Sequence, residues 1–147
     1  SNSLDKNLEQ HLEILNNYNA PDWEQYKYEK NEKNITDSDK FINYHKNLVF
    51  SNDYCDIYII TWFTTSVIHD HADNGCIFKI LQGKLSEEKY KKENGYLEFV
   101  NSRILKKNDI GYIDNRIGYH KMANIQSQPS YSIHIYSPSK YKCKEIK

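Results

Sequence analysis

The sequence predicts a mainly β protein, an antiparallel sandwich or barrel, preceded by short helices. From residue 41 onward, short runs rich in Ile, Val, Thr and aromatic residues follow one another at regular intervals, which is typical of such folds. The N-terminal stretch instead carries leucines at helical spacing. At 147 residues, the chain is long enough for one domain with one buried core.

Leucines spaced three or four residues apart predict an amphipathic helix over residues 3–17. They are Leu4, Leu8, Leu12 and Leu15. Pro21 is expected in the first turn of a second short helix, because its fixed φ suits that position. Residues 29–40 are charged and polar and predict a solvated linker. We therefore expect an N-terminal helical segment and linker over 1–40 and a β-barrel over 41–147, together one domain.

The β region divides into seven predicted strands. They cover residues 56–65, 76–82, 84–90, 96–100, 110–113, 119–125 and 131–136. The turns between them carry Gly, Asn, Asp or Pro, which favour the backbone conformations of turns. They are centred near Gly75, Gly83, Gly95, Asn108 and Pro129.

Composition excludes several classes of partner. Lys and Arg number 20, as do Asp and Glu, so no net charge would attract nucleic acid or acidic membranes. No apolar run approaches the ~20 residues of a membrane span, and the N-terminal stretch lacks the apolar segment of a signal peptide. Three cysteines are too few for a disulfide framework, which favours a reducing cytoplasmic setting.

The sequence His69-Asp70-His71 predicts a metal site. On a strand, side chains at i and i+2 point to the same face, so both imidazoles can bind one ion. With His120 they would form a three-histidine site, and neutral imidazole suits Zn, Fe, Cu or Ni. Asp70 must then point away and support a neighbouring segment. His45, like His11, is expected to be an ordinary polar residue.

The two histidine segments resemble the two conserved motifs of the cupin family. The first has the form H-x-H, four residues, Cys76, six residues and Gly83, and the second is the H-x-x-x-N of His120 and Asn124. Cys76 stands where the usual cupin has a glutamate ligand. The resemblance implies a single cupin, jelly-roll-like β-barrel.

Three segments resemble cysteine dioxygenase of the mammalian type more narrowly. They read I-H-D-H-x-x-x-x-C-x-x-K-x-L-Q-G over 68–83, I-G-Y-H-K-M-A-N over 117–124 and S-I-H-I-Y-S-P over 132–138. The resemblance covers roughly residues 41–143. It implies a non-haem iron enzyme that oxidises L-cysteine with O2 to cysteine sulfinic acid. Fe(II) would be held by His69, His71 and His120, in a monomer that binds neither nucleic acid nor membranes.

The resemblance also assigns roles to one strand face. Ser132, His134 and Tyr136 alternate along the chain, so on a strand they share a face. In the family they form a Ser–His–Tyr hydrogen-bond chain, with the tyrosine hydroxyl near the substrate. The family's cysteine at the position of Cys76 forms a thioether with the tyrosine matched by Tyr136. A buried free thiol is the alternative fate of Cys76, and Cys143 is expected near the mouth of the pocket.

Lys46 departs from the family, which has an arginine that binds the substrate carboxylate at this position. Lysine keeps the charge but not the planar fork of arginine, so substrate selection is expected to be looser. Tyr44 matches the tyrosine that contacts the same carboxylate, and Arg116 is an alternative anion anchor. The chain ends at Lys147, where relatives continue, which is expected to leave one side of the pocket more open.

Three other functions remain open from the sequence. The first is a dioxygenase of another small thiol, such as 3-mercaptopropionate or cysteamine, which Lys46 keeps open. The second is a metal-binding cupin with little catalysis. The third is a zinc hydrolase or isomerase, ranked last because no carboxylate base is evident near the ligands.

Overall fold

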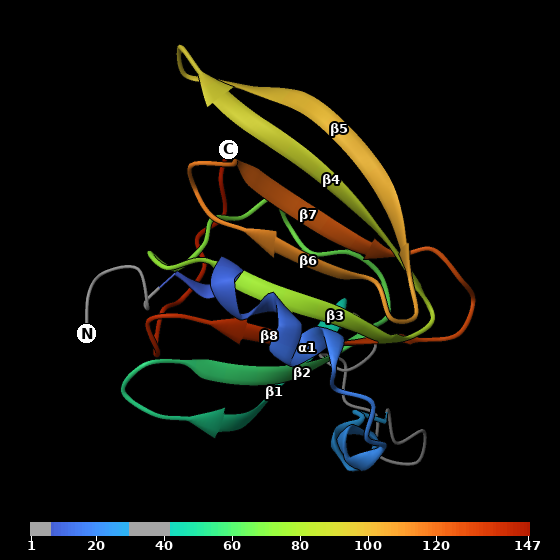
Figure 1. Cartoon of the computed structure of the whole chain (residues 1–147). Helices are drawn as coiled ribbons and strands as arrows, with labels where there is room; N and C mark the ends of the chain where they lie inside the picture. Colours follow the sequence, from blue (N-terminus) through green and yellow to red (C-terminus); the bar gives the residue numbers. More distant parts are fainter. Residues whose placement is uncertain (1–6, 30–41) are drawn as a thin grey trace.

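Two antiparallel sheets pack against each other in the computed structural model, which describes residues 7–29 and 42–147 (Figure 1). The larger sheet has the order β1-β2-β8-β3-β6, and the smaller has the order β5-β4-β7. The strands are β1 Tyr44–Ser51, β2 Asp56–Trp62, β3 Cys76–Gln82, β4 Lys84–Glu93, β5 Tyr96–Lys106, β6 Ile110–Ile113, β7 Tyr119–Asn124 and β8 Ser130–Tyr136. The fold class is therefore as predicted, a cupin β-sandwich, although among the described residues no ladder closes the two sheets into a continuous barrel.

The core between the sheets is built from the inward side chains of both. It contains Ile60, Trp62, Cys76, Phe78, Ile80, Leu85, Leu105, Ile113, Met122 and Tyr136. On β3, Cys76, Phe78 and Ile80 alternate into this core, whereas Ile77 and Leu81 belong to a second cluster. β3 is thus covered on both faces, which explains its nearly continuous apolar sequence.

Short helices cover the outer face of β3 (Figure 1). They are the 3-10 helix η2 Leu8–His11, the helix α1 Leu12–Asn16 and the 3-10 helix η3 Asp22–Tyr26. The predicted helix over 3–17 is thus shorter and begins as a 3-10 turn. Its first leucine, Leu4, lies outside the described residues, as do residues 30–40 of the linker predicted over 29–40.

Lys79 ties this helical segment to the sheet. Its side chain is 2% exposed, and its ammonium donates to the carbonyls of Asn16 (3.3 Å) and Tyr18 (2.7 Å). These carbonyls lie at the end of α1, where no helical N–H is left to bind them. The lysine in the middle of an apolar strand is therefore explained by helix capping.

The hairpin of β4 and β5 is longer than predicted. Its strands continue to Glu93 and Lys106, and it projects beyond the rest of the sandwich in Figure 1. Asn94 and Gly95 at its tip have positive φ values of 52° and 81°, the requirement of a two-residue I′ turn. The distal parts of both strands are polar and lack the apolar pattern of a buried strand, so the prediction made both strands too short.

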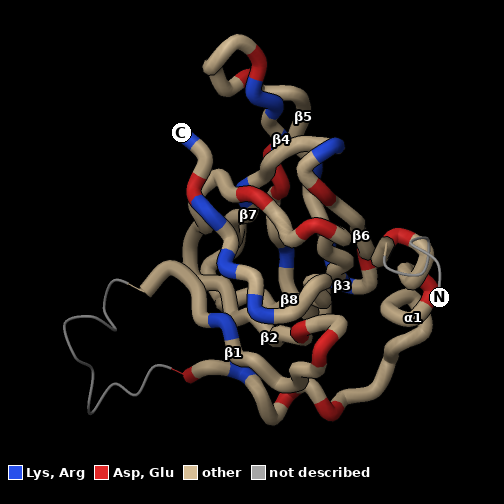
Figure 2. The backbone as a smooth tube through the Cα atoms, turned by 90° about the vertical axis from the view of Figure 1, so that its left-hand side faces the viewer, with Lys and Arg blue, Asp and Glu red and all other residues tan. Residues whose placement is uncertain are grey.

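Two surface properties bear on function. Within the described residues, no helix is long and apolar enough to cross a membrane. Basic and acidic residues are interspersed along the chain seen in Figure 2, as the equal numbers of both charges suggest.

Candidate metal centre

The backbone brings the three predicted ligands together. His69 and His71 lie in the connection between β2 and β3, not on a regular strand as predicted. An isolated antiparallel bridge nevertheless pairs His69 with His120 on β7, and the His69 N–H donates to the His120 carbonyl at 3.0 Å. One ligand atom from each of the three imidazoles lies within 4.8 Å of the others. This spacing allows all three to bind a single ion.

The Nδ1 atom of each imidazole already contacts an acceptor. The acceptors are the Val67 carbonyl at 2.9 Å from His69, Asn115 Oδ1 at 3.3 Å from His71 and Glu87 Oε2 at 2.8 Å from His120. An acceptor at Nδ1 holds the proton there and leaves the Nε2 lone pair for a metal. Nε2 of His71 is buried and has no hydrogen-bond partner among the described residues. Because buried polar atoms are normally satisfied, this nitrogen fits a metal ligand.

Two of the three histidines are held neutral. Burial and the nearby His120 lower the pKa of His69 to about 3 and the pKa of His71 to about 2. Imidazole must be neutral to bind a metal. At neutral pH these two side chains are therefore ready to act as ligands without losing a proton.

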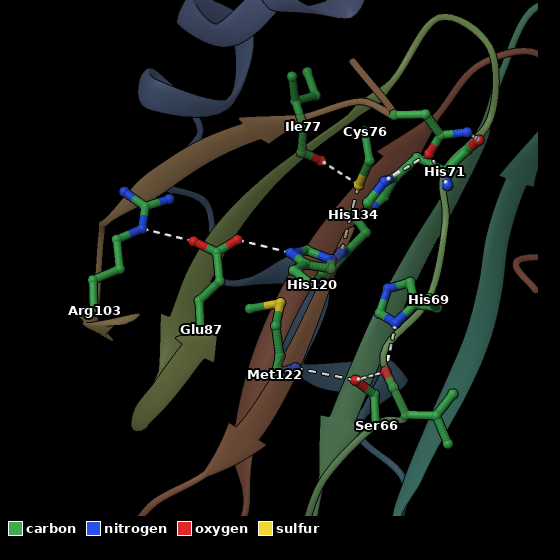
Figure 3. Close-up of polar contacts among 12 residues, drawn as sticks. Ser66, His69, His71, Cys76, Ile77, Glu87, Arg103, His120, Met122 and His134 are labelled. Carbon is green, nitrogen blue, oxygen red and sulfur yellow. Dashed lines mark hydrogen bonds and ion pairs between the residues drawn. The ribbon is translucent and has the colours of Figure 1, made fainter. Parts of the chain in front are cut away.

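Glu87 is part of the site, and the sequence prediction missed it. It lies on β4, is 1% exposed, and connects His120 to Arg103, whose Nε donates to its other oxygen at 2.7 Å (Figure 3). Burial alone would raise its pKa, but His120 and Arg103 outweigh burial and lower the pKa to about 2. The only sequence signal was that Glu87 shares the inward phase of β4 with Leu85.

Asn115 is a second residue that the sequence did not single out. Its Oδ1 accepts from the His71 backbone N–H at 2.9 Å, and its Nδ2 donates to the His71 carbonyl at 3.3 Å. Together with the contact to Nδ1, these bonds fix both the backbone and the ring of His71.

A small cavity of about 60 Å³ lies beside the histidines. His69 and His120 line it, together with the predicted substrate-binding residues Tyr44 and Lys46 on β1. The Lys46 ammonium lies 4.8 Å from the centroid of the Tyr136 ring. Two of the candidate metal ligands therefore line the same cavity as a positively charged side chain.

Arg116 is not available as the alternative anion anchor. Its side chain is 76% exposed, and its Nη2 lies 2.6 Å from the carboxylate of Asp114. The prediction that it serves as an alternative anion anchor is therefore wrong, because Arg116 lies in the turn after β6 rather than on a strand with His120.

The face of β8 carries Ser132, His134 and Tyr136 inward, as predicted. Ser132 Oγ lies 2.7 Å from His134 Nε2 and accepts a hydrogen bond from the indole N–H of Trp62 at 2.8 Å. His134 Nδ1 lies 3.7 Å from Cys76 Sγ, whereas the rings of His134 and Tyr136 stack with centroids 6.0 Å apart. The expected hydrogen bond from His134 to Tyr136 is thus replaced by stacking.

Cys76 and Tyr136 are direct partners in the ladder of β3 and β8. Both side chains are buried in the core between the sheets. Burial raises the pKa of both groups, so thiol and phenol are protonated. The pairing brings the two predicted cross-linking partners side by side.

The C-terminal segment lies against the ligand-bearing connection. Asp70 accepts hydrogen bonds from the Tyr141 hydroxyl and the Lys144 backbone N–H, both at 2.7 Å. The segment also places Cys143 in the wall of the cavity. Asp70 points away from the metal ligands, as the alternation of side chains predicted, and fixes the segment beside them.

Replacing Asp70 by Ala should lower the free energy of unfolding by about 1–3 kcal/mol, because the Tyr141 hydroxyl and the Lys144 N–H lose their buried, charged acceptor. Urea denaturation of the apo protein measures this change. Asp73→Ala, an exposed aspartate in the same connection, is the control and should have little effect. Equal losses in both variants would contradict the anchoring role of Asp70.

The family model of cysteine dioxygenase type I matches residues 7–147. This chain belongs to that family. Cysteine dioxygenase type 1 of Bos taurus is 39% identical over 103 residues, which cover 65% of this chain and 51% of the relative. The Danio rerio protein of the same name is 32% identical over 109 residues, covering 69% of this chain and 54% of the relative. The chain thus spans about half the length of these curated relatives.

Solved structures support the fold of this cysteine dioxygenase family member. An oxalate oxidase in complex with the substrate analogue glycolate aligns with a TM-score of 0.51 and 14% identity, over 63% of this chain and 46% of that one. An oxalate decarboxylase from Lactobacillus farciminis aligns with a TM-score of 0.51 and 13% identity, over 64% and 27%. At this identity, the similarity concerns the cupin fold alone.

Proposed function

We propose that this chain is a non-haem iron dioxygenase that oxidises L-cysteine to cysteine sulfinic acid. One observation carries the proposal: three imidazoles converge beside a cationic side chain in a member of the cysteine dioxygenase family. In the overall reaction, a thiol and one O2 give a sulfinic acid, with both oxygen atoms bonded to sulfur. Sulfur is oxidised, dioxygen is reduced, and no other reactant is needed.

His69, His71 and His120 would hold the iron. Bound by three neutral ligands, Fe(II) would keep its full dipositive charge and supply a site for an anionic thiolate and for activation of dioxygen. The contribution of the protein is to hold the three Nε2 atoms toward one point. The acceptors at Nδ1 perform this task before any metal arrives.

Lys46 and Tyr44 would bind the carboxylate of the substrate. The ammonium of Lys46 is a point charge that can pair with a carboxylate but cannot form the two parallel bonds of arginine. Burial raises the pKa of Tyr44, so its hydroxyl stays protonated and can donate to the same carboxylate. Both side chains line the cavity with the histidines.

Tyr136 would donate a hydrogen bond to the substrate from its protonated hydroxyl. Ser132 and Trp62 hold His134 in place through the bonds described above, and His134 stacks on the ring of Tyr136. We infer that Ser132 and His134 position Tyr136 by this packing. They need no proton transfer to do so.

We also propose that Cys76 forms a thioether with Tyr136. The new bond joins Sγ to a ring carbon, and two protons and two electrons leave, with O2 as the electron acceptor. Protein purified after aerobic turnover with iron and L-cysteine should weigh less than the calculated mass by two hydrogen atoms, and peptide mapping should join the two residues. Cys76→Ser is the matched control and should show the calculated mass. An unshifted mass after prolonged turnover would contradict the cross-link.

The second candidate is a dioxygenase of a different small thiol. Lys46 favours it, because its ammonium lies over the rings of Tyr58 (4.4 Å) and Tyr136 (4.8 Å) and can adapt to carboxylates of different reach. 3-Mercaptopropionate keeps the carboxylate and lacks the amine, whereas cysteamine keeps the amine and lacks the carboxylate. A metal-binding cupin without catalysis would consume no oxygen with any of the three thiols.

Oxygen uptake by the iron-loaded protein with these three thiols tests the proposal. We expect the fastest uptake with L-cysteine, slower uptake with 3-mercaptopropionate and the slowest with cysteamine. Faster uptake with 3-mercaptopropionate would favour the second candidate. The absence of thiol-dependent uptake in a protein that binds iron would contradict both. Because three cysteines are too few for a disulfide framework, we propose that the protein works in a reducing compartment such as the cytoplasm.

A further inference from the structure

The three candidate ligands differ in the charge of their outer partners. His69 faces a backbone carbonyl and His71 faces an amide, both neutral. His120 faces the Glu87 carboxylate, whose side chain is 0% exposed. Figure 3 shows Arg103, Glu87 and His120 joined in a row, and the outer member, Arg103, has a side chain that is 43% exposed. His120 is therefore the one candidate ligand of the three whose outer hydrogen-bond partner is charged.

Three strands build this row. Glu87 lies on the central strand β4 and pairs in register with Arg103 on β5. On its other side, Glu87 pairs with Met122 on β7, and His120 lies two residues before Met122 on the same strand. Gly111 on β6 leaves room for the guanidinium, since an added Cβ would lie 2.7 Å from Arg103 Nη2. A carboxylate buried among apolar residues is held here by two specific hydrogen bonds, both of which point along the row.

A carboxylate that accepts the outer N–H of a ligating histidine fixes the tautomer and makes the imidazole a stronger electron donor. Arg103 works against this effect, because its charge neutralises Glu87. With both present, the row adds no net charge to the site. A cation at this site then keeps its attraction for an anionic thiolate while one ligand is strengthened.

We propose that Glu87 is a positioning residue that fixes His120 and makes it the strongest donor of the three ligands, and that Arg103 limits this effect. The inference rests on the metal site of the proposed function but not on dioxygenase activity. It makes His120, rather than His69 or His71, the ligand through which the protein sets metal affinity.

The two partners should then act in opposite directions. Glu87→Gln keeps the shape but has one acceptor oxygen where two are needed, so it should weaken metal binding by about tenfold to a hundredfold. Arg103→Met leaves the carboxylate unopposed, so metal binding should be at least as tight as in the wild type. If Glu87 served only the fold, both substitutions would lower the stability of the protein. Metal affinity would then not fall in Glu87→Gln while staying the same or rising in Arg103→Met.

Titration of the apo protein with cobalt(II), followed by visible absorption, measures the affinity for the metal. Thermal unfolding of the apo protein measures its stability. Glu88→Gln is the matched control, since Glu88 is the next residue on β4 and pairs with Lys121 at 3.1 Å at the partly exposed surface. It should leave cobalt affinity unchanged. The double variant Glu87→Gln with Arg103→Met removes both charges, so it should fold even if Glu87→Gln alone does not. It should bind cobalt more weakly than the wild type, because it also lacks the Glu87 carboxylate.

Wild-type cobalt affinity in Glu87→Gln or in the double variant would overturn the inference, as would equal weakening by Glu87→Gln and Arg103→Met. A wild-type protein that binds no cobalt would overturn the metal site as well. If cobalt binds as expected but the iron form oxidises no thiol, the proposed function fails and the role of Glu87 stands.

Discussion

Replacing His71 by Ala should abolish metal binding and thiol-dependent oxygen consumption together. His71 is 1% exposed, and its buried Nε2 finds no partner within residues 7–29 and 42–147, so a bound ion would be its natural contact. A metal ion supplies several kcal/mol in such reactions, and each ~1.4 kcal/mol is tenfold, so turnover should fall by about a thousandfold or more. Elemental analysis of the purified variant and oxygen uptake with L-cysteine measure the two losses.

The matched control is His45→Ala. His45 lies on β1 and stacks on Tyr28 at 4.2 Å between centroids, outside the group of three ligands. It should keep full metal content and most of its activity. If His71→Ala kept stoichiometric iron, or if His45→Ala lost it to the same degree, the assignment of the ligands would be wrong.

Replacing Lys46 by Met should weaken the use of thiols that carry a carboxylate. A hydrogen bond to a charged group contributes about 1.5–3 kcal/mol, so kcat/KM for L-cysteine should fall about tenfold to a hundredfold. The same loss is expected for 3-mercaptopropionate. Cysteamine has no carboxylate, so its low kcat/KM should not fall. Steady-state oxygen uptake with each thiol gives the comparison.

Two further variants define the role of Lys46. Lys121→Met removes a lysine on β7 that pairs with Glu88, and should leave all three thiols unaffected. Lys46→Arg should lower the KM for L-cysteine, because the planar guanidinium can form two parallel bonds with a carboxylate. Equal losses for L-cysteine and cysteamine in Lys46→Met would show that the residue supports the fold of the cavity rather than binding the carboxylate.

The sequence predicted well what depends on local pattern. The bounds of β3 and β6 agree with the predicted strands at 76–82 and 110–113, because apolar strands end where turn residues begin. The H-x-H spacing and His120 pointed to the group of three imidazoles that the structure forms. The alternation on β8 placed Ser132, His134 and Tyr136 on one inward face.

What the sequence did not reveal depends on contacts between distant segments. Glu87 resembles a surface residue until the sheets pack and bring Arg103 and His120 to its two oxygens. Asn115 carries no local signal, because its partners are atoms of a connection 44 residues away. Arg116 was placed wrongly for the same reason, since the turn that contains it directs its side chain to Asp114 and solvent.

Mass spectrometry of the product formed from L-cysteine under isotopically labelled O2 tests the central claim most directly. Iron-loaded protein should give cysteine sulfinic acid that carries two labelled oxygen atoms, and protein treated with a chelator should give none. Cystine as the sole product, or sulfinate whose oxygen comes from water, would contradict a dioxygenase reaction at the site of His69, His71 and His120.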